Sequence, residues 1–107
     1  MRFFGLKSCD TCRKALAQLR AAGYDLQVID VRADGIAPDD LAMIVAQFGD
    51  AAINRASTTW RELSDLQRQD NPVALLAAYP TLLKRPVIDN AGVWHQGWRP
   101  EVRRLLV

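Results

Sequence analysis

Residues 2–23 read RFFGLKSCDTCRKALAQLRAAG and carry the clearest structural pattern in the chain. Arg2–Gly5 is short, carries two phenylalanines and ends at glycine, which is typical of a short strand. From Cys12 onward, apolar side chains recur at helical spacing, and Gly23 follows as a residue that ends a helix. These apolar positions are Ala15, Leu16, Leu19 and Ala22. The stretch predicts a strand, a tight turn and a helix.

A second strand is predicted directly after this helix. Tyr24–Val31 places Leu26 and Val28 on one face and Ile29 and Val31 on the other. Apolar side chains on both faces are typical of a strand that helices cover from both sides. The β-α-β order implies two parallel strands joined by a right-handed crossover.

The middle of the chain predicts three helices. The first runs from Pro38 to Phe48 and ends at Gly49, and the second spans residues 58–66 with Trp60 facing inward. The third opens at Asn71-Pro72, because asparagine caps a helix and proline fits its first turn. Pro80 then interrupts the helical pattern, so the helices lie between two strand-containing halves.

The last part of the chain predicts a hairpin and a helix. Pro86–Asp89 and Val93–Gln96 are separated by a three-residue loop at Asn90–Gly92, and Pro100 begins the final helix. We therefore expect an α/β protein with a thioredoxin-like fold. Its mixed four-stranded sheet would have a helical insertion between the β-α-β and β-β-α halves. A length of 107 residues suits one domain, residues 1–107.

Charge and hydropathy exclude several classes of function. The 14 basic and 12 acidic side chains leave a net charge of +2 and alternate along the chain, so we expect no direct binding to nucleic acid or to membranes. No apolar stretch approaches the roughly 20 residues that cross a bilayer, and Lys7 interrupts the N-terminal apolar run before it resembles a signal peptide. We expect a cytoplasmic protein in a reducing compartment.

The strongest chemical signal is the Cys-x-x-Cys motif at Cys9 and Cys12. It lies between a predicted strand and helix, where free backbone N–H groups and the helix dipole stabilise a nucleophilic thiolate. Lys7 and Arg13 add positive charge nearby. A structural zinc site is not expected, because His95 is the only other nitrogen or sulfur ligand of that kind. The motif predicts a redox-active cysteine, with Cys9 as the nucleophile.

Four motifs in order resemble the ArsC/Spx family, and the resemblance covers essentially the whole chain. They are GLKSCDTCRKA (residues 5–15), STTWREL (57–63), LKRPVI (83–88) and GWRPE (97–101). The first two most resemble a short ArsC-like branch described as glutathione-dependent thiol reductases. The resemblance matches Cys9 to the single catalytic cysteine of arsenate reductases. There the cysteine attacks an oxyanion, glutathione releases the product through a mixed disulfide, and arginines hold the anion.

The resemblance also assigns the arginines. Arg85, directly before Pro86, matches one anion-binding arginine, and Arg99 matches another. Pro86 is expected to be cis, which would turn the Arg85 backbone toward the thiol and offer an edge for glutathione. The third family arginine corresponds to Arg55 or is lost at the following alanine. Arg13 is a further candidate, and a guanidinium would hold a phosphate-like oxyanion or a glutathione carboxylate.

Cys12 has two alternative roles. It resolves a disulfide with Cys9, as in Spx proteins, or it packs on its helix as a small apolar residue. The leading hypothesis is a cytoplasmic ArsC-family oxidoreductase that uses Cys9 in mixed-disulfide chemistry, with glutathione as co-substrate, glutaredoxin as a further partner and no tightly bound cofactor. Its substrate would be a small oxyanion or a disulfide. The alternatives are an arsenate reductase, or an Spx-like redox switch that binds the RNA polymerase α subunit.

Overall fold

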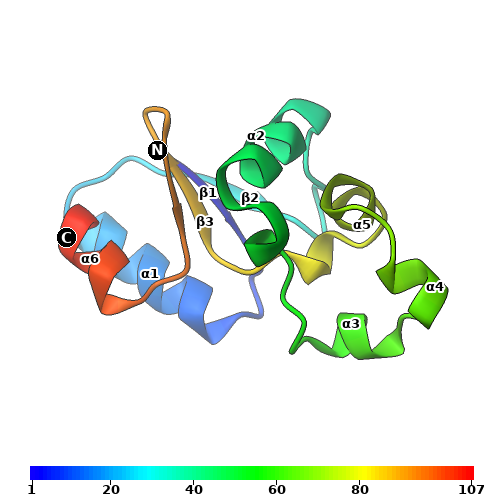
Figure 1. The fold of residues 1–107 in the computed structure, drawn as a ribbon. Coiled ribbons are helices and arrows are strands. Elements are labelled where there is room, and N and C mark those ends of the chain that lie inside the picture. Colours follow the sequence, from blue (N-terminus) through cyan, green and yellow to red (C-terminus); the bar gives the residue numbers. More distant parts are fainter. The chain divides into compact units, whose positions relative to one another are not determined.

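The computed structural model describes residues 1–107, which form two units (Figure 1). The first unit consists of Met1–Asp30 and Arg85–Val107, and the second of Val31–Lys84. The first unit contains both cysteines and the whole sheet. The second unit is helical apart from an isolated bridge between Ile53 and Leu83.

The sheet of the first unit has four strands in the order β2-β1-β3-β4. β1 pairs in parallel with β2 and antiparallel with β3, and β3 pairs antiparallel with β4. The strands are β1 Arg2–Gly5, β2 Gln27–Asp30, β3 Val87–Asn90 and β4 Val93–Gln96. The predicted mixed four-stranded α/β sheet, with the helical segment between its two halves in the sequence, is confirmed.

Two helices, α1 (Asp10–Ala21) and α6 (Pro100–Leu106), pack on one face of this sheet (Figure 1). The apolar spacing that predicted α1 faces inward and meets side chains from β1, β3 and α6. The buried cluster consists of Phe3, Cys12, Ala15, Leu19, Ile88 and Leu106. The hydroxyl of Tyr24 donates a 2.6 Å hydrogen bond to the Leu106 carbonyl, which ties the end of α6 to the segment after α1. Cys12 is therefore part of the core that holds α1 to the sheet.

β2 differs from the prediction in length and in burial. It spans four residues instead of the eight of Tyr24–Val31, and Gln27 and Val28 are exposed. The predicted length was therefore wrong. β2 is the outermost strand of the sheet, with a strand neighbour on one side only, and apolar alternation does not reveal a strand's place in the sheet.

The hairpin loop is shorter than predicted. Asn90 pairs with Val93, so only Ala91 and Gly92 connect β3 to β4, and the expected three-residue loop was wrong. Both loop residues have positive φ angles, 50° at Ala91 and 88° at Gly92. Two-residue hairpin loops favour such angles, because the resulting turn matches the right-handed twist of the strands.

The second unit consists of α-helices and two short 3₁₀ segments. Leu41 and Ile44 of α2 and Leu75 and Leu76 of α5 are buried. The elements are α2 Pro38–Phe48, η1 Gly49–Ala52, α3 Thr58–Glu62, α4 Asp65–Arg68, α5 Pro72–Ala78 and η2 Pro80–Leu82. None of the helices of the protein combines the length and the apolar character that crossing a bilayer requires.

The predicted helix at residues 58–66 is in fact two helices, α3 and α4. The break occurs because Ser64 begins a new helix with a capping box. Its hydroxyl accepts a 3.1 Å hydrogen bond from the Gln67 N–H, and its own N–H donates to Gln67 Oε1 at 2.8 Å. In this reciprocal pair, the backbone N–H groups of Ser64 and Gln67 each donate to the side chain of the other residue, as at the start of a helix.

The predicted cap of α5 provides a test of local stability. Asn71 Oδ1 accepts a 2.9 Å hydrogen bond from the Ala74 N–H at the start of α5. Asn71→Ala is expected to lower the free energy of unfolding by about 1 kcal/mol, because that N–H loses its acceptor. Urea denaturation measures the change, and Asp70→Ala is the control, since the neighbouring side chain is exposed and caps nothing. Equal losses in the two variants would contradict the assignment.

Candidate active site

Cys9 lies where β1 has ended and α1 begins. It is the N-cap residue of α1, with extended backbone angles (φ −89°, ψ 118°). Its N–H donates to the Leu6 carbonyl at 3.1 Å, and its carbonyl accepts from the Arg13 N–H at 3.0 Å. The side chain is partly exposed, so a reactant can reach the sulfur. Sequence reasoning predicted this position at the positive end of the helix.

The environment of Cys9 favours the thiolate. Partial burial raises its pKa, but the backbone N–H and the thiol of Cys12 and the guanidinium of Arg85 all lower it. The lowering contributions together outweigh burial, so the pKa of the Cys9 thiol lies below its ordinary value. A thiolate held in this way is both a nucleophile and a good leaving group from a mixed disulfide.

Cys12 has the opposite character. Only 1% of its surface is exposed, and it packs against Ala15 and Leu19 in the core. Burial, helped by the neighbouring Cys9 thiolate, raises the pKa of the Cys12 thiol to about 12. Cys12 is therefore protonated at neutral pH and donates its hydrogen bond to Cys9. Both cysteines are free thiols in this structure.

Gly5 gives the Cys12 sulfur the space it occupies. A Cβ atom at Gly5 would lie 2.9 Å from Cys12 Sγ and 2.8 Å from Cε1 of Phe3, which is closer than such atoms approach. Phe3 and Cys12 are both buried, so neither can move away freely. Sequence reasoning used Gly5 only as the end of a strand. Its position four residues before Cys9 is a sequence signal of close backbone approach.

Arg85 is the arginine that the structure brings to Cys9. It is half-buried, and its guanidinium forms a hydrogen bond with the Cys9 sulfur. The Arg85–Pro86 peptide bond is cis, as the family resemblance implied. Pro86 itself is buried, and its carbonyl accepts a 2.7 Å hydrogen bond from the Gly97 N–H beyond the end of β4. Arg85 thus supplies positive charge directly beside the reactive sulfur.

Arg99 and Arg13 are placed differently. Arg99 is exposed at the N-cap of α6, and its side chain makes no hydrogen bond or ion pair within the protein. Arg13 forms an ion pair with Asp10 in the first turn of α1, and both side chains are exposed. Neither contributes to the lowered pKa of the Cys9 thiol. Arg99 is therefore available to a ligand as it stands, whereas Arg13 would have to leave its partner.

Arg55 lies in the second unit and has partners there. Its guanidinium is 5.2 Å from the centre of the Trp60 ring and donates a 3.2 Å hydrogen bond to the Asp50 carbonyl. The Asp50 carboxylate lies 3.9 Å from Arg55 Nη2. These contacts order the side chain within Val31–Lys84. A role of Arg55 in anion binding stays a prediction.

The structure brings together no group of three or more His, Cys, Asp or Glu side chains that could hold a metal ion. His95 lies on β4 opposite Ile88 and is partly buried there. Around the Cys9 sulfur, the structure places the protonated Cys12 thiol and the Arg85 guanidinium.

Selective alkylation tests the contrast between the two thiols. Because iodoacetamide reacts with thiolates, the rate of Cys9 alkylation in the folded protein is expected to have its midpoint at a lower pH than in urea. Cys12 is expected to stay unmodified up to pH 10, because its pKa is about 12 and it is buried. Peptide mapping measures both rates, with Cys9→Ser as the control. Equal alkylation of the two cysteines in the folded state would contradict this assignment.

A mixed sheet of this order, with a cysteine at the start of the first helix and a cis-proline before the third strand, defines a thioredoxin-like protein. The chain belongs to the ArsC family, whose model matches residues 4–104. Family membership supports a redox enzyme.

Several known proteins are similar over most of their length. An uncharacterised protein of Haemophilus influenzae is 41% identical over 94 residues, which cover 83% of this chain and 82% of the relative. The solved structure of the YFFB protein is 29% identical with a TM-score of 0.86, covering 98% of this chain and 96% of that one. An arsenate reductase (ArsC) related protein from Brucella melitensis is 28% identical with a TM-score of 0.73, covering 97% and 91%.

Proposed function

We propose that this protein is a glutathione-dependent thiol reductase in which Cys9 is the only cysteine that forms a covalent intermediate. The Cys9 thiolate attacks the glutathione sulfur of a mixed disulfide, forms an S–S bond with it and releases the substrate as a thiolate, which takes up a proton. A second glutathione thiolate then attacks the Cys9 adduct. This step forms oxidised glutathione and returns Cys9 to the thiolate.

The observation that carries this proposal is the asymmetry between the two cysteines. Cys9 is partly exposed with a lowered pKa, whereas Cys12 is buried with a pKa raised to about 12. Once Cys9 is in a mixed disulfide, it no longer raises the pKa of Cys12 through charge. Burial, the largest influence, remains, and a protonated thiol does not attack a disulfide. A glutathione thiolate from solution, and not Cys12, then cleaves the mixed disulfide on Cys9.

Arg85 has two roles in this proposal. Its guanidinium stabilises the Cys9 thiolate as the attacking and as the leaving group. In the adduct, where Cys9 carries no charge, the same guanidinium binds a carboxylate of glutathione. Arg99, which is exposed and without an intramolecular partner, is the second candidate for such a carboxylate. Arg13 and Arg55 are weaker candidates because both already have carboxylate partners.

The test is the mass of the reduced protein after exposure to oxidised glutathione at pH 7. One glutathione adduct is expected, and peptide mapping is expected to place it on Cys9. Cys12→Ala should form the same adduct and Cys9→Ser none. Closure to a Cys9–Cys12 disulfide, recognised by the loss of two hydrogens, would overturn the proposal. It would favour a redox switch of the Spx kind, for which binding to the RNA polymerase α subunit is the next measurement.

Arsenate reduction is a second candidate function, favoured by the guanidinium of Arg85 beside the thiolate. The Brucella melitensis relative is described as related to arsenate reductase. In this reaction Cys9 attacks arsenate, and two glutathione molecules supply the electrons that yield arsenite and oxidised glutathione. Arsenate-dependent oxidation of glutathione that disappears in Cys9→Ser would support it. Oxidation at the same rate without arsenate would exclude it.

A further inference from the structure

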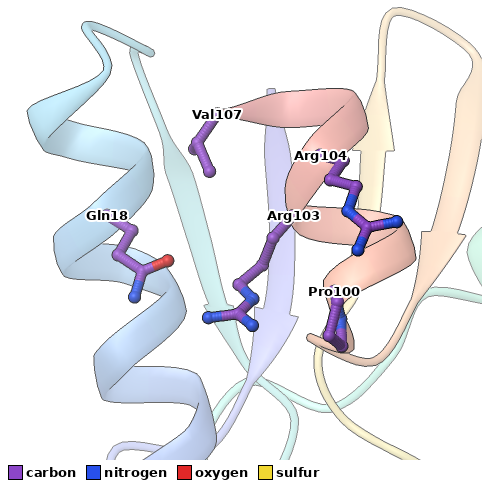
Figure 2. Close-up of a pocket in the computed structure, with 5 residues that line it drawn as sticks. All are labelled: Gln18, Pro100, Arg103, Arg104 and Val107. Carbon is purple, nitrogen blue, oxygen red and sulfur yellow. The ribbon is translucent and has the colours of Figure 1, made fainter.

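A groove of about 470 Å³ lies between α1 and α6 (Figure 2). Gln18 of α1 and Arg103 of α6 point into the space between the two helices (Figure 2). Pro100, Arg104 and Val107 complete the lining. Gln18 follows Cys9 by nine positions along the chain, which corresponds to roughly 13 Å along the helix axis. The groove is therefore separate from the reactive sulfur.

The two arginines of the groove have no anionic partner. Neither Arg103 nor Arg104 forms a salt bridge or a side-chain hydrogen bond, and the lining contains no carboxylate side chain. The Arg103 Nε atom is moreover buried without a hydrogen-bond partner. Arg2 and Arg13, by contrast, each pair with an aspartate. A buried N–H group without an acceptor is costly, so an acceptor oxygen from a ligand would be favoured here.

Gln18 is oriented as a further donor. Its Oε1 accepts a 3.1 Å hydrogen bond from the indole N–H of Trp98, which fixes which end of the amide is the oxygen. Its Nε2 makes no hydrogen bond within the protein. The groove thus has two guanidinium groups from α6 and one amide donor from α1. The two full positive charges exceed the negative charge that the main-chain carboxylate of Val107 and the end of the α6 dipole, roughly −0.5, bring to the same region.

We propose that this groove binds a small phosphate-bearing molecule through Arg103, Arg104 and Gln18. Because the donors come from two helices, the bound group must present acceptor oxygens in more than one direction. A phosphate does so with three oxygens, whereas a carboxylate has two in one plane. The groove is larger than a phosphate, and Pro100 and Val107 offer apolar contacts for the organic part of an ester.

Nuclear magnetic resonance titration of the ¹⁵N-labelled full chain tests the proposal. The probes are phenyl phosphate, inorganic phosphate and succinate, at matched ionic strength and pH 7.5. The indole N–H signal of Trp98 reports on the groove through its bond to Gln18, whereas those of Trp60 and Trp94 serve as internal references. Phenyl phosphate is expected to shift the Trp98 indole and the backbone amides of Arg103 and Arg104 in a saturable way.

Matched variants test whether phenyl phosphate binds at the arginines of the groove. Arg103→Gln and Arg104→Gln are each expected to weaken phenyl phosphate binding about tenfold or more. Arg20→Gln removes an exposed arginine of the same helix as Gln18 that does not line the groove, and it should change the affinity less than about twofold. Arg104 is exposed, so its variant keeps the test valid if Arg103→Gln fails to fold.

A third variant, Arg85→Gln, separates the groove from the cysteine site. Groove binding should be unchanged in Arg85→Gln, whether or not the proposed reductase activity exists. Three results would overturn the proposal: no saturable shift, shifts that persist in both Arg103→Gln and Arg104→Gln, or shifts that disappear in Arg85→Gln. Succinate binding as tightly as phenyl phosphate would overturn the assignment of the ligand as a phosphate.

Discussion

Cys9→Ser is expected to lower the proposed reductase activity to the uncatalysed background. A serine hydroxyl is not ionised at neutral pH and cannot form the mixed disulfide on which the proposed cycle depends. The measurement is the rate of oxidised glutathione formation from glutathione and its mixed disulfide with 2-mercaptoethanol, coupled to glutathione reductase. Binding of the substrate need not change, so the loss should be found in kcat.

Cys12→Ala is the matched control for this prediction, and its activity is expected to fall only a few-fold. Removing the Cys12 thiol takes away one hydrogen bond that lowers the pKa of Cys9. A less stabilised thiolate is less abundant but intrinsically more nucleophilic, so the two effects largely cancel at pH 7. Loss of activity in Cys12→Ala as complete as in Cys9→Ser would contradict a single-cysteine cycle and indicate a dithiol mechanism.

Gly5→Ala is expected to lower the free energy of unfolding by about 2–3 kcal/mol, at the upper end of overpacking effects. The added methyl group meets Phe3 and Cys12 in the core at distances below 3.0 Å. Moving Cys12 also displaces the thiol that donates to Cys9, so the midpoint of Cys9 alkylation should move to higher pH. Urea denaturation and alkylation measure the two effects.

Gly92→Ala separates packing from backbone conformation. Gly92 has a φ of 88° and open space around its Cβ position, so the substitution costs about 1 kcal/mol through its backbone alone. It should leave Cys9 alkylation unchanged.

In the Gly5→Ala background, Cys12→Ala is expected to recover part of the lost stability, because the double change removes one of the two clashes. Additive losses would contradict direct contact between the two positions.

Local signals predicted most of the fold. Helical periodicity located α1, α2 and α5, and the asparagine-proline pair marked the start of α5. The order of strands and helices was enough to predict the mixed sheet. The wrong predictions concern features that depend on contacts with other parts of the chain or on helix capping. Alternating apolar residues could not show that β2 lies at the edge of the sheet, nor could helical spacing show that Ser64 would begin a new helix.

The sequence predicted some residues of the candidate site but not the tertiary contacts between them. The Cys-x-x-Cys motif placed Cys9 at the start of a helix, and the family resemblance pointed to Arg85. The burial of Cys12 had a signal, since it shares the helical face of Ala15 and Leu19 at spacings of three and seven. No local pattern showed that Gly5 seats the Cys12 sulfur, because that contact joins β1 to α1. The unpaired state of Arg103 likewise depends on packing between α1 and α6.

With Cys12 enclosed in the core, an oxidised Cys9 has almost no thiolate partner on the same chain. Burial still holds the pKa of the Cys12 thiol above its ordinary value in this state, so Cys12 stays protonated at pH 7. Decay of the adduct is then bimolecular, and its rate is proportional to the concentration of thiol in solution. After a brief oxidation, the rate at which Cys9 returns to the free thiol should fall in proportion to the glutathione concentration. The fraction of modified protein would then report how much thiol is present.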